Sequence, residues 1–263
     1  MRKRWLWLIP VLATAGAAGW WFHEPLADLW QTTLGGLDHG LRQKLQPDPK
    51  TYVTLTAGLE RSRRKLAERH RNAGNEAERS AVEAEARVVL ENTLPAMMHC
   101  WLGTPWDFNG TAAKPGGGRI ACGYFVATVL KDAGFQVDRY QLAQQASGEI
   151  LRSFLPKESC ALTVGKDYQA FASEVEKREP GVYIVGLDSH VAFVIVGGEG
   201  FRVIHSSGSR PWCVVDESRA EAGVLQRSKW RMLGNLTANP GVLKRWLKAE
   251  KIVVRGGPEG KGR

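Results

Sequence analysis

Cysteine is scarce in this chain, and its placement does not suggest a metal site. Four cysteines occur among 263 residues (Cys100, Cys122, Cys160 and Cys213), and none of their spacings matches a zinc ligand set. In an exported protein some of them could pair, but the sequence does not show which. Hydrophobic residues make up 43% and charged residues 24%, which excludes a wholly disordered, collagen-like or disulfide-stapled miniature chain. No cofactor or metal is indicated.

An excess of charge is missing from the body of the chain, although the whole chain carries a formal charge of +9. Residues 1–22 hold three bases and no acid, and residues 238–263 hold seven bases and two acids, which leaves +1 for residues 23–237. Basic ends suit an anionic lipid or polymer better than sequence-specific DNA recognition. Because Trp246 is the only aromatic residue in the basic segment 244–263, nucleic-acid binding has little support, and we expect a solvated tail there.

No charged residue lies between Trp5 and Phe22, directly after Arg2, Lys3 and Arg4. A basic segment followed by an apolar run is typical of a signal peptide or a signal-anchor helix. The run is at the lower limit for crossing a hydrocarbon core of roughly 30 Å. Small residues at 13–17 offer cleavage sites, whereas the aromatic residues at 20–22 suit the outer end of a retained helix. Both alternatives place the rest of the chain outside the cytoplasm, either membrane-anchored or secreted.

Helix-forming residues dominate the first half of the body, and short runs of β-branched residues dominate the second half. We predict helices at 56–71, 76–92 and 120–134, and strands at 182–185, 191–196, 201–204 and 212–215. Helices followed by antiparallel strands indicate an α+β fold. The expected division is a signal anchor or signal peptide at 1–22, a connector and helical arm at 23–95, a catalytic domain at 96–237 and a basic C-terminal tail at 238–263.

Cys122 differs from the other cysteines because it follows a glycine-rich loop and lies in the first turn of a predicted helix. Unpaired backbone N–H groups at a helix start lower a thiol pKa and favour the nucleophilic thiolate. The same N–H groups could hold the oxyanion of a tetrahedral intermediate. The alternative is a small buried cysteine with no chemical role, which is the commoner situation.

Two histidines flank a predicted β-hairpin and support the first interpretation. The segment Gly197–Gly200 predicts a tight turn in which Val196 faces Phe201, and this register places Ala192 opposite His205. His190 then lies on the same sheet face as His205, diagonal to it and roughly 7–8 Å away by Cα. Such a pair could form a catalytic base held by a second imidazole, directly or through water. The alternative is two unrelated histidines at strand ends.

Four segments resemble, in order and spacing, the motif blocks of NlpC-type cell-wall cysteine peptidases. They lie between about residues 98 and 210: GTPWDFNG at 103–110, ACGYFV at 121–126, HVAFVIV at 190–196 and IHS at 204–206. The resemblance implies a papain-like core with helices packed on an antiparallel sheet. It also implies that Cys122 is the nucleophile, His190 the general base and His205 the orienting residue, and that the substrate is the stem peptide of peptidoglycan.

The chain departs from that family next to the nucleophile. The family usually has Asp-Cys-Ser-Gly, whereas this chain has Ala-Cys-Gly-Tyr at 121–124, and Trp106 stands where the family usually has a tyrosine. We therefore expect a different substrate pocket, with Trp106, Tyr124 and Asp188 as candidate binding residues. Asp188 is also an alternative partner for the imidazole of His190.

Three functions remain open at this point. The first is a peptidase or amidase, acting on peptidoglycan or on an apolar acyl substrate or a different peptide linkage. The second is a thiol acyltransferase, in which an amine or hydroxyl takes the place of water. The third is a catalytically inactive, membrane-tethered binding or scaffold protein. All three place the N-terminal helix in a membrane if it is retained, and none requires a nucleic acid.

Overall fold

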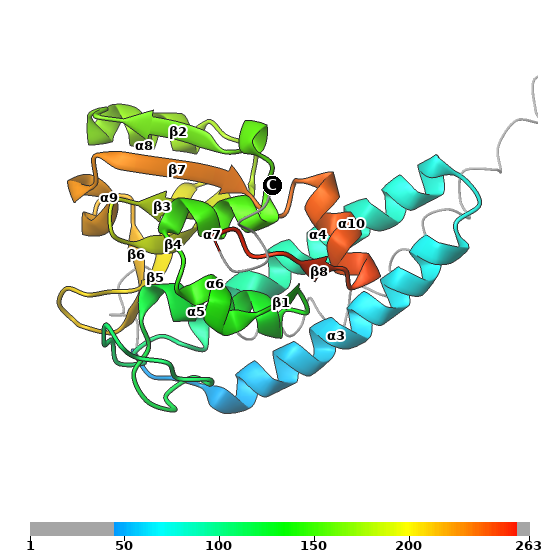
Figure 1. Ribbon diagram of the computed structural model, residues 1–263, viewed down its shortest axis with the longest axis horizontal. Helices are drawn as coiled ribbons and strands as arrows, with labels where there is room; N and C mark the ends of the chain where they lie inside the picture. Colours follow the sequence, from blue (N-terminus) through cyan, green and yellow to red (C-terminus); the bar gives the residue numbers. More distant parts are fainter. Residues whose placement is uncertain (1–44, 257–263) are drawn as a thin grey trace, which may run out of the picture. The chain divides into compact units, whose positions relative to one another are not determined.

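The computed structural model describes residues 45–256, which form one compact unit (Figure 1). The predicted signal or anchor segment at 1–22 lies outside the described residues, as do residues 23–44 of the expected connector. Over residues 45–256, no helix combines the length and the apolar character that crossing a bilayer requires. The described chain has helices and a large antiparallel sheet, which confirms the α+β prediction.

Three helices come first, and four strands follow one another later in the chain without a helix between them. The helical elements are α3 (Pro49–Asn72), α4 (Glu76–His99), α5 (Cys122–Asp132), α6 (Arg139–Ala143), α7 (Ser147–Phe154), the 3-10 turn η1 (Lys157–Ser159), α8 (Tyr168–Glu176), α9 (Gly223–Arg227) and α10 (Pro240–Lys248). The strands are β1 (Gln136–Val137), β2 (Ala161–Val164), β3 (Gly181–Leu187), β4 (Val191–Gly197), β5 (Gly200–Ser206), β6 (Val214–Ser218), β7 (Trp230–Asn235) and β8 (Lys251–Ile252).

Six strands form the main sheet in the order β2-β7-β3-β4-β5-β6, and every neighbouring pair is antiparallel. Helices cover both faces of its centre. On one face Phe125 of α5 packs edge-to-face against Phe193 of β4, with ring centroids 5.9 Å apart. On the other face Phe171 of α8 joins a second apolar cluster that includes Val194 and Val203. Burial on both faces explains why β3 and β4 read as nearly continuous apolar runs.

Three predicted strands lie within β3, β4 and β5, and the predicted hairpin register is confirmed. The fourth, predicted at 212–215, overlaps β6 only at Val214 and Val215, because β6 begins two residues later and ends at Ser218. Val196 pairs with Phe201 across the turn, and Phe193 pairs with Ile204. The glycine-rich turn allows this register because Gly200 has a φ of +107°, which a residue with a side chain rarely adopts.

The predicted helices are also confirmed, but the first two are longer than expected. α3 begins at Pro49, seven residues before the predicted start, because Asp48 caps it by accepting a hydrogen bond from the Thr51 N–H. α4 continues to His99 through Pro95, and Asn75 caps its start through the Glu78 N–H. The two helices run side by side as a long pair (Figure 1).

The predicted basic tail is wrong for residues 240–252, which form α10 and β8. Four apolar side chains of α10 are buried: Val242, Leu243, Trp246 and Leu247. They face α3 and α4, while the three bases of the same helix are partly or fully exposed: Lys244, Arg245 and Lys248. Trp246 also donates from its indole N–H to the Ala133 carbonyl at 2.7 Å. The charge count concealed an amphipathic helix, because its apolar stripe recurs at helical spacing between the bases.

Candidate active site

Cys122 is the first residue of α5. Hydrogen bonds tie the loop before it to the end of β5 and to the segment at 105–110. The Ser206 hydroxyl at the end of β5 donates to the Ile120 carbonyl at 2.7 Å, and the Ile120 N–H donates to the Pro105 carbonyl at 2.9 Å. The Ala121 N–H in turn donates to the Gly110 carbonyl. These bonds fix the position of the two residues before Cys122, and therefore the place where the helix starts.

The thiol of Cys122 is surrounded by backbone N–H groups but is not acidic. It receives backbone hydrogen bonds from Val191, from Gly123 and from its own N–H. Burial nevertheless raises the pKa of the Cys122 thiol, because desolvation of the thiolate exceeds the effect of these donors. The expected lowering at the helix start is therefore wrong in direction. In the resting protein the sulfur carries its proton.

His190 and His205 are in direct contact, as the hairpin register predicted. His190 Nε2 lies 2.8 Å from His205 Nδ1, and the two rings are nearly perpendicular with centroids 4.8 Å apart. His190 lies at the entrance to β4, in a turn closed by a hydrogen bond from the Leu187 N–H to the His190 carbonyl. The diagonal pair needs no bridging water, because both side chains reach toward the same end of the hairpin.

The environment of His190 keeps its imidazole neutral. Burial is the largest cause that lowers the pKa of His190 well below its usual value, followed by the repulsion that a protonated His205 would exert and by the charge of Arg227. A neutral imidazole can accept a proton, whereas an imidazolium cannot. At neutral pH the cleft therefore holds an uncharged thiol and an uncharged imidazole.

Glu217 extends the hydrogen-bonded pair of His190 and His205, and the sequence did not predict its contribution. Its Oε2 lies 3.1 Å from His205 Nε2, so that both ring nitrogens of His205 have partners. His205 is only 2% exposed. Glu217 lies on β6 opposite Val203, two residues before His205 along the neighbouring strand. The alternation along β6 could have shown that Glu217 shares a face with Val215, but the loop at 207–213 leaves the register of β6 open to sequence reasoning.

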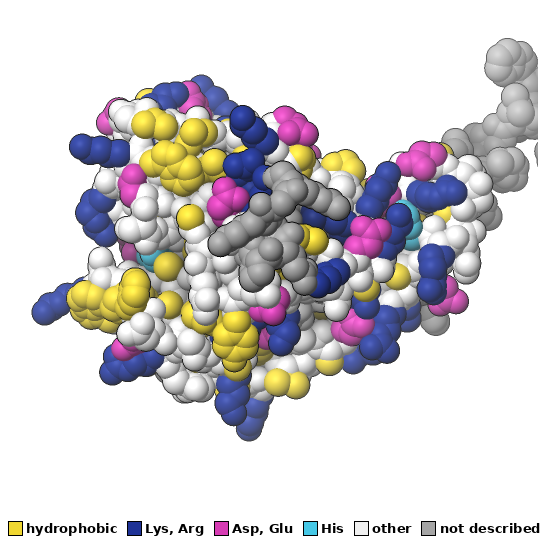
Figure 2. Space-filling view, in the orientation of Figure 1, with side chains coloured by type: hydrophobic (Ala, Val, Ile, Leu, Met, Phe, Trp, Pro, Cys, Tyr) yellow, Lys and Arg dark blue, Asp and Glu magenta, His cyan; other side chains and the backbone are white. Residues whose placement is uncertain are grey.

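Cys122 and His190 line one cleft of about 690 Å³. Its other walls come from the loop before α7, from α7 itself, from the turn before β4 and from β7. The remaining lining residues are Gly123, Ala143, Gln145, Ala146, Ser147, Gly148, Glu149, Ile150, Arg152, Leu187, Asp188, Ser189, Val191, Trp230 and Met232. Hydrophobic side chains gather on the surface over β2 and β7, next to this wall, and separately over the loop between β5 and β6 (Figure 2).

Of the three predicted binding residues, only Asp188 lines the cleft. Its carboxylate accepts hydrogen bonds from the Ser228 hydroxyl and from the N–H groups of Lys229 and Trp230. These donors, with Ser228 the strongest, hold the pKa of the Asp188 carboxyl below its usual value. Asp188 thus ties the turn before His190 to the start of β7. The imidazole contact of His190 goes to His205 instead.

Trp106 and Tyr124 lie outside the cleft lining. The Trp106 ring packs against Trp212, with centroids 5.6 Å apart. The Tyr124 ring packs edge-to-face on Tyr140, and the guanidinium of Arg139 lies 5.0 Å from its centroid. Both side chains make aromatic contacts beside the loop and helix that carry Cys122, and their role in substrate binding stays a prediction.

Gly123 explains one departure from the family pattern. A Cβ at this position would lie 2.4 Å from the carbonyl oxygen of Ala143, at the end of α6. A serine therefore does not fit here. The missing side chain lets the chain after α6 approach the start of α5, so that Ala143 becomes part of the cleft wall beside Cys122.

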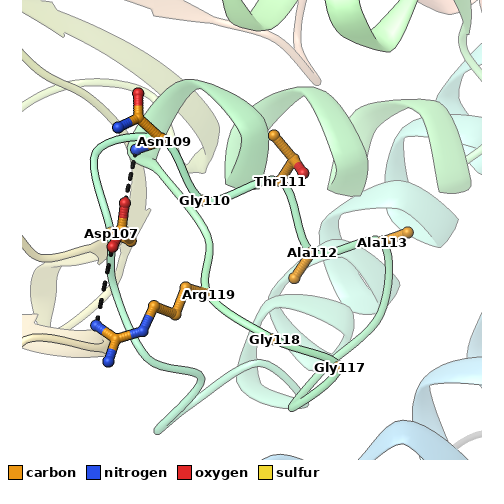
Figure 3. Close-up of a pocket in the computed structure, with 9 residues that line it drawn as sticks. All are labelled: Asp107, Asn109, Gly110, Thr111, Ala112, Ala113, Gly117, Gly118 and Arg119. Carbon is orange, nitrogen blue, oxygen red and sulfur yellow. Dashed lines mark hydrogen bonds and ion pairs between the residues drawn. The ribbon is translucent and has the colours of Figure 1, made fainter.

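A smaller cavity of about 460 Å³ lies within the loop that precedes α5 (Figure 3). Asp107 and Arg119 face each other across it at 3.9 Å, and Asp107 also accepts the Asn109 N–H. It contains none of the predicted catalytic residues. The ion pair and the backbone turns stabilise the loop, and the predicted nucleophile and base line the larger cleft instead.

All four cysteines are free thiols in the structure, so none of the disulfides left open by the sequence is present. Comparison of the chain with models of protein families finds no match, and comparison with curated proteins finds none either. What the cleft can do must therefore be inferred from its own residues.

Proposed function

We propose that this protein is an exported cysteine hydrolase with a papain-like core that cleaves amide or peptide bonds in peptidoglycan stem peptides. One observation carries the proposal. A cysteine at a helix start and a histidine that is hydrogen-bonded to a second histidine open onto the same cleft. The order along the chain, with the nucleophile first and the two histidines later, agrees with the NlpC-type resemblance.

The proposed reaction begins with two neutral groups. His190 takes the proton of Cys122 as the sulfur attacks the substrate carbonyl carbon, and the N–H groups at the start of α5 hold the oxyanion. His190 then gives this proton to the leaving amine, and the substrate remains as a thioester on Cys122. Water deprotonated by His190 attacks the thioester, which releases the acid and restores the thiol.

The cleft lining favours a peptide over a simple hydrocarbon chain. Glu149, Arg152 and Asp188 offer charges of both signs, while Trp230 and Met232 offer an apolar wall. A peptide with charged groups and aliphatic side chains could use both. The basic N-terminus suits retention in the cell envelope and contact with an anionic polymer, with membrane attachment through residues 1–22.

The raised thiol pKa favours a second candidate, a catalytically inactive binding or scaffold protein on the same fold. In that case the thiol never transfers its proton to His190. Iodoacetamide separates the two candidates without a substrate. If His190 accepts the proton, Cys122 reacts much faster than Cys160, whose pKa burial also raises. Equal, slow labelling of both would favour the binding protein.

The test of the proposed function incubates the full chain with purified peptidoglycan and follows the released fragments by mass spectrometry. Cys122→Ala should lose about a thousandfold or more of the rate without unfolding. Cys160→Ala, which changes a partly buried cysteine outside the cleft, should keep it. Hydrolysis by Cys122→Ala at the wild-type rate would end the proposal. An added amine that appears in the product would identify the acyltransferase.

A further inference from the structure

Three side chains form a hydrogen-bonded row that begins with His190 at the cleft, which Cys122 also lines. Cys122 comes from α5, His190 from the entrance to β4, His205 from β5 and Glu217 from β6. The two distances along the row are 2.8 Å between the histidines and 3.1 Å from His205 to the carboxylate. Within residues 45–256, Glu217 is the one acceptor that the structure gives to Nε2 of His205.

The direction of each hydrogen bond follows from the last member of the row. A carboxylate accepts hydrogen bonds and donates none, so His205 must carry a proton on Nε2. In a neutral ring Nδ1 of His205 then has a lone pair, and it must accept from Nε2–H of His190. His190 is neutral and has one ring proton, which leaves its Nδ1 as a base.

We propose that Glu217 is a positioning residue, which acts through His205 to hold His190 in the tautomer that can take the proton of Cys122. The catalytic consequence rests on the proposed function, but the tautomer itself does not. When the proton moves from sulfur to Nδ1, His190 keeps its Nε2–H and becomes an imidazolium. The Glu217 carboxylate takes no proton and stabilises the new positive charge across His205.

Other charged groups near the row cannot replace Glu217. Arg227 of α9 faces His190 as a cation, which opposes the imidazolium. Tyr168 of α8 lies near Glu217, but its hydroxyl donates to the Arg219 carbonyl. Cys122 lines the same cleft as His190 and is the proposed source of the proton. The carboxylate is therefore the group that decides which way the two imidazoles are oriented.

The first test measures the alkylation rate of Cys122 by iodoacetamide against pH, with peptide mapping to separate the four cysteines. Glu217→Gln removes the negative charge that stabilises the imidazolium, whichever way the amide turns. An amide that donates from its N–H₂ to His205 Nε2 also reverses both tautomers and places a proton on the cleft side of His190. We expect the rate near neutral pH to fall about tenfold or more, and the midpoint to move to higher pH. Glu217→Asp, which keeps a carboxylate, should recover part of the loss.

The matched control is Glu199→Gln, which removes the same charge from the exposed turn between β4 and β5. Its alkylation rate and midpoint should equal those of the wild type. Equal profiles for Glu217→Gln and the wild type would overturn the proposal.

The second test uses the wild-type protein, so it does not depend on whether a variant folds. Nitrogen-15 shifts of the imidazoles in the wild-type protein at neutral pH distinguish the two tautomers directly. Both His190 and His205 should carry their proton on Nε2, and a proton on Nδ1 of His190 would contradict the inference. A protein with these tautomers that cleaves no amide would lose the proposed function but not the inference. Cleavage by Glu217→Gln at the wild-type rate would overturn the inference but leave the proposed function in place.

Discussion

Two buried histidines of this protein each meet a glutamate, yet only one of these pairs leads to a cleft. His70 of α3 lies 3.0 Å from Glu83 of α4, and His205 lies 3.1 Å from Glu217. In the helical pair the next group is Lys244 of α10, 3.7 Å from Glu83. In the sheet the next group is His190 at the cleft wall. A buried histidine–acid pair is therefore not a site in itself, and the partner of the second nitrogen decides its role.

The largest expected effect would separate the roles of the two histidines. His205→Ala should lower kcat for amide cleavage about a hundredfold, because His190 loses the group that holds its ring. KM should change little, since His205 is absent from the cleft lining. Measuring kcat and KM from the rate at which fragments are released from peptidoglycan checks this expectation. An unchanged kcat would mean that the His205–Glu217 pair, like the His70–Glu83 pair, only stabilises the fold.

The helical pair should show the opposite pattern. Glu83→Ala should lower the free energy of unfolding by about 2 kcal/mol, because His70 Nε2 loses its partner where both side chains are buried. Urea unfolding measures this loss. The alkylation rate of Cys122 in the folded variant should match the wild type. A slowed thiol would show that the helical pair influences the cleft.

The hairpin was predictable in detail because local rules determine it. The turn at 197–200 leaves one register that keeps the apolar residues of both strands paired, and this register brings His190 to His205. The fold class followed in the same way from helices placed before strands. Both results depend on residues that are close together in sequence.

The missed features depend on distant contacts. β7 was not predicted, because Arg231 occupies an inward position in it and interrupts the apolar alternation. Its guanidinium is satisfied by the carbonyls of Leu225 and Lys166 and by the Phe171 ring, 4.8 Å away. Glu217 was missed because the sequence does not show where the loop at 207–213 ends, and therefore does not fix the register of β6 against β5. The pKa of Cys122 was wrong because sequence shows the helix start but not the burial.

A smaller effect would test the geometry of the cleft wall. Gly123→Ala should destabilise the protein by about 1–2 kcal/mol, because the new Cβ would meet the Ala143 carbonyl at 2.4 Å. It should also slow alkylation of Cys122, since the start of α5 must shift. Gly58→Ala in α3 is the matched control, because its Cβ finds no atom closer than 3.8 Å. That change should stabilise the helix by about 0.5–1 kcal/mol. Equal unfolding free energies for the two variants would contradict the close approach.

The smallest effect concerns the acid side of the stability curve. Because the folded protein holds the pKa of His190 well below 6.5, the unfolded chain takes up a proton first as the pH falls through that value. The more protonated state gains at lower pH, so stability should fall from about pH 6.5 downward, by at most about 1.4 kcal/mol per pH unit. Above this range His190 is neutral in both states and contributes no slope. His190→Gln removes the group, so its curve from pH 7.5 to 5 should be flatter than that of the wild type. Parallel curves in urea unfolding would mean that His190 titrates alike in the folded and unfolded chain, and that the cleft does not keep its base neutral.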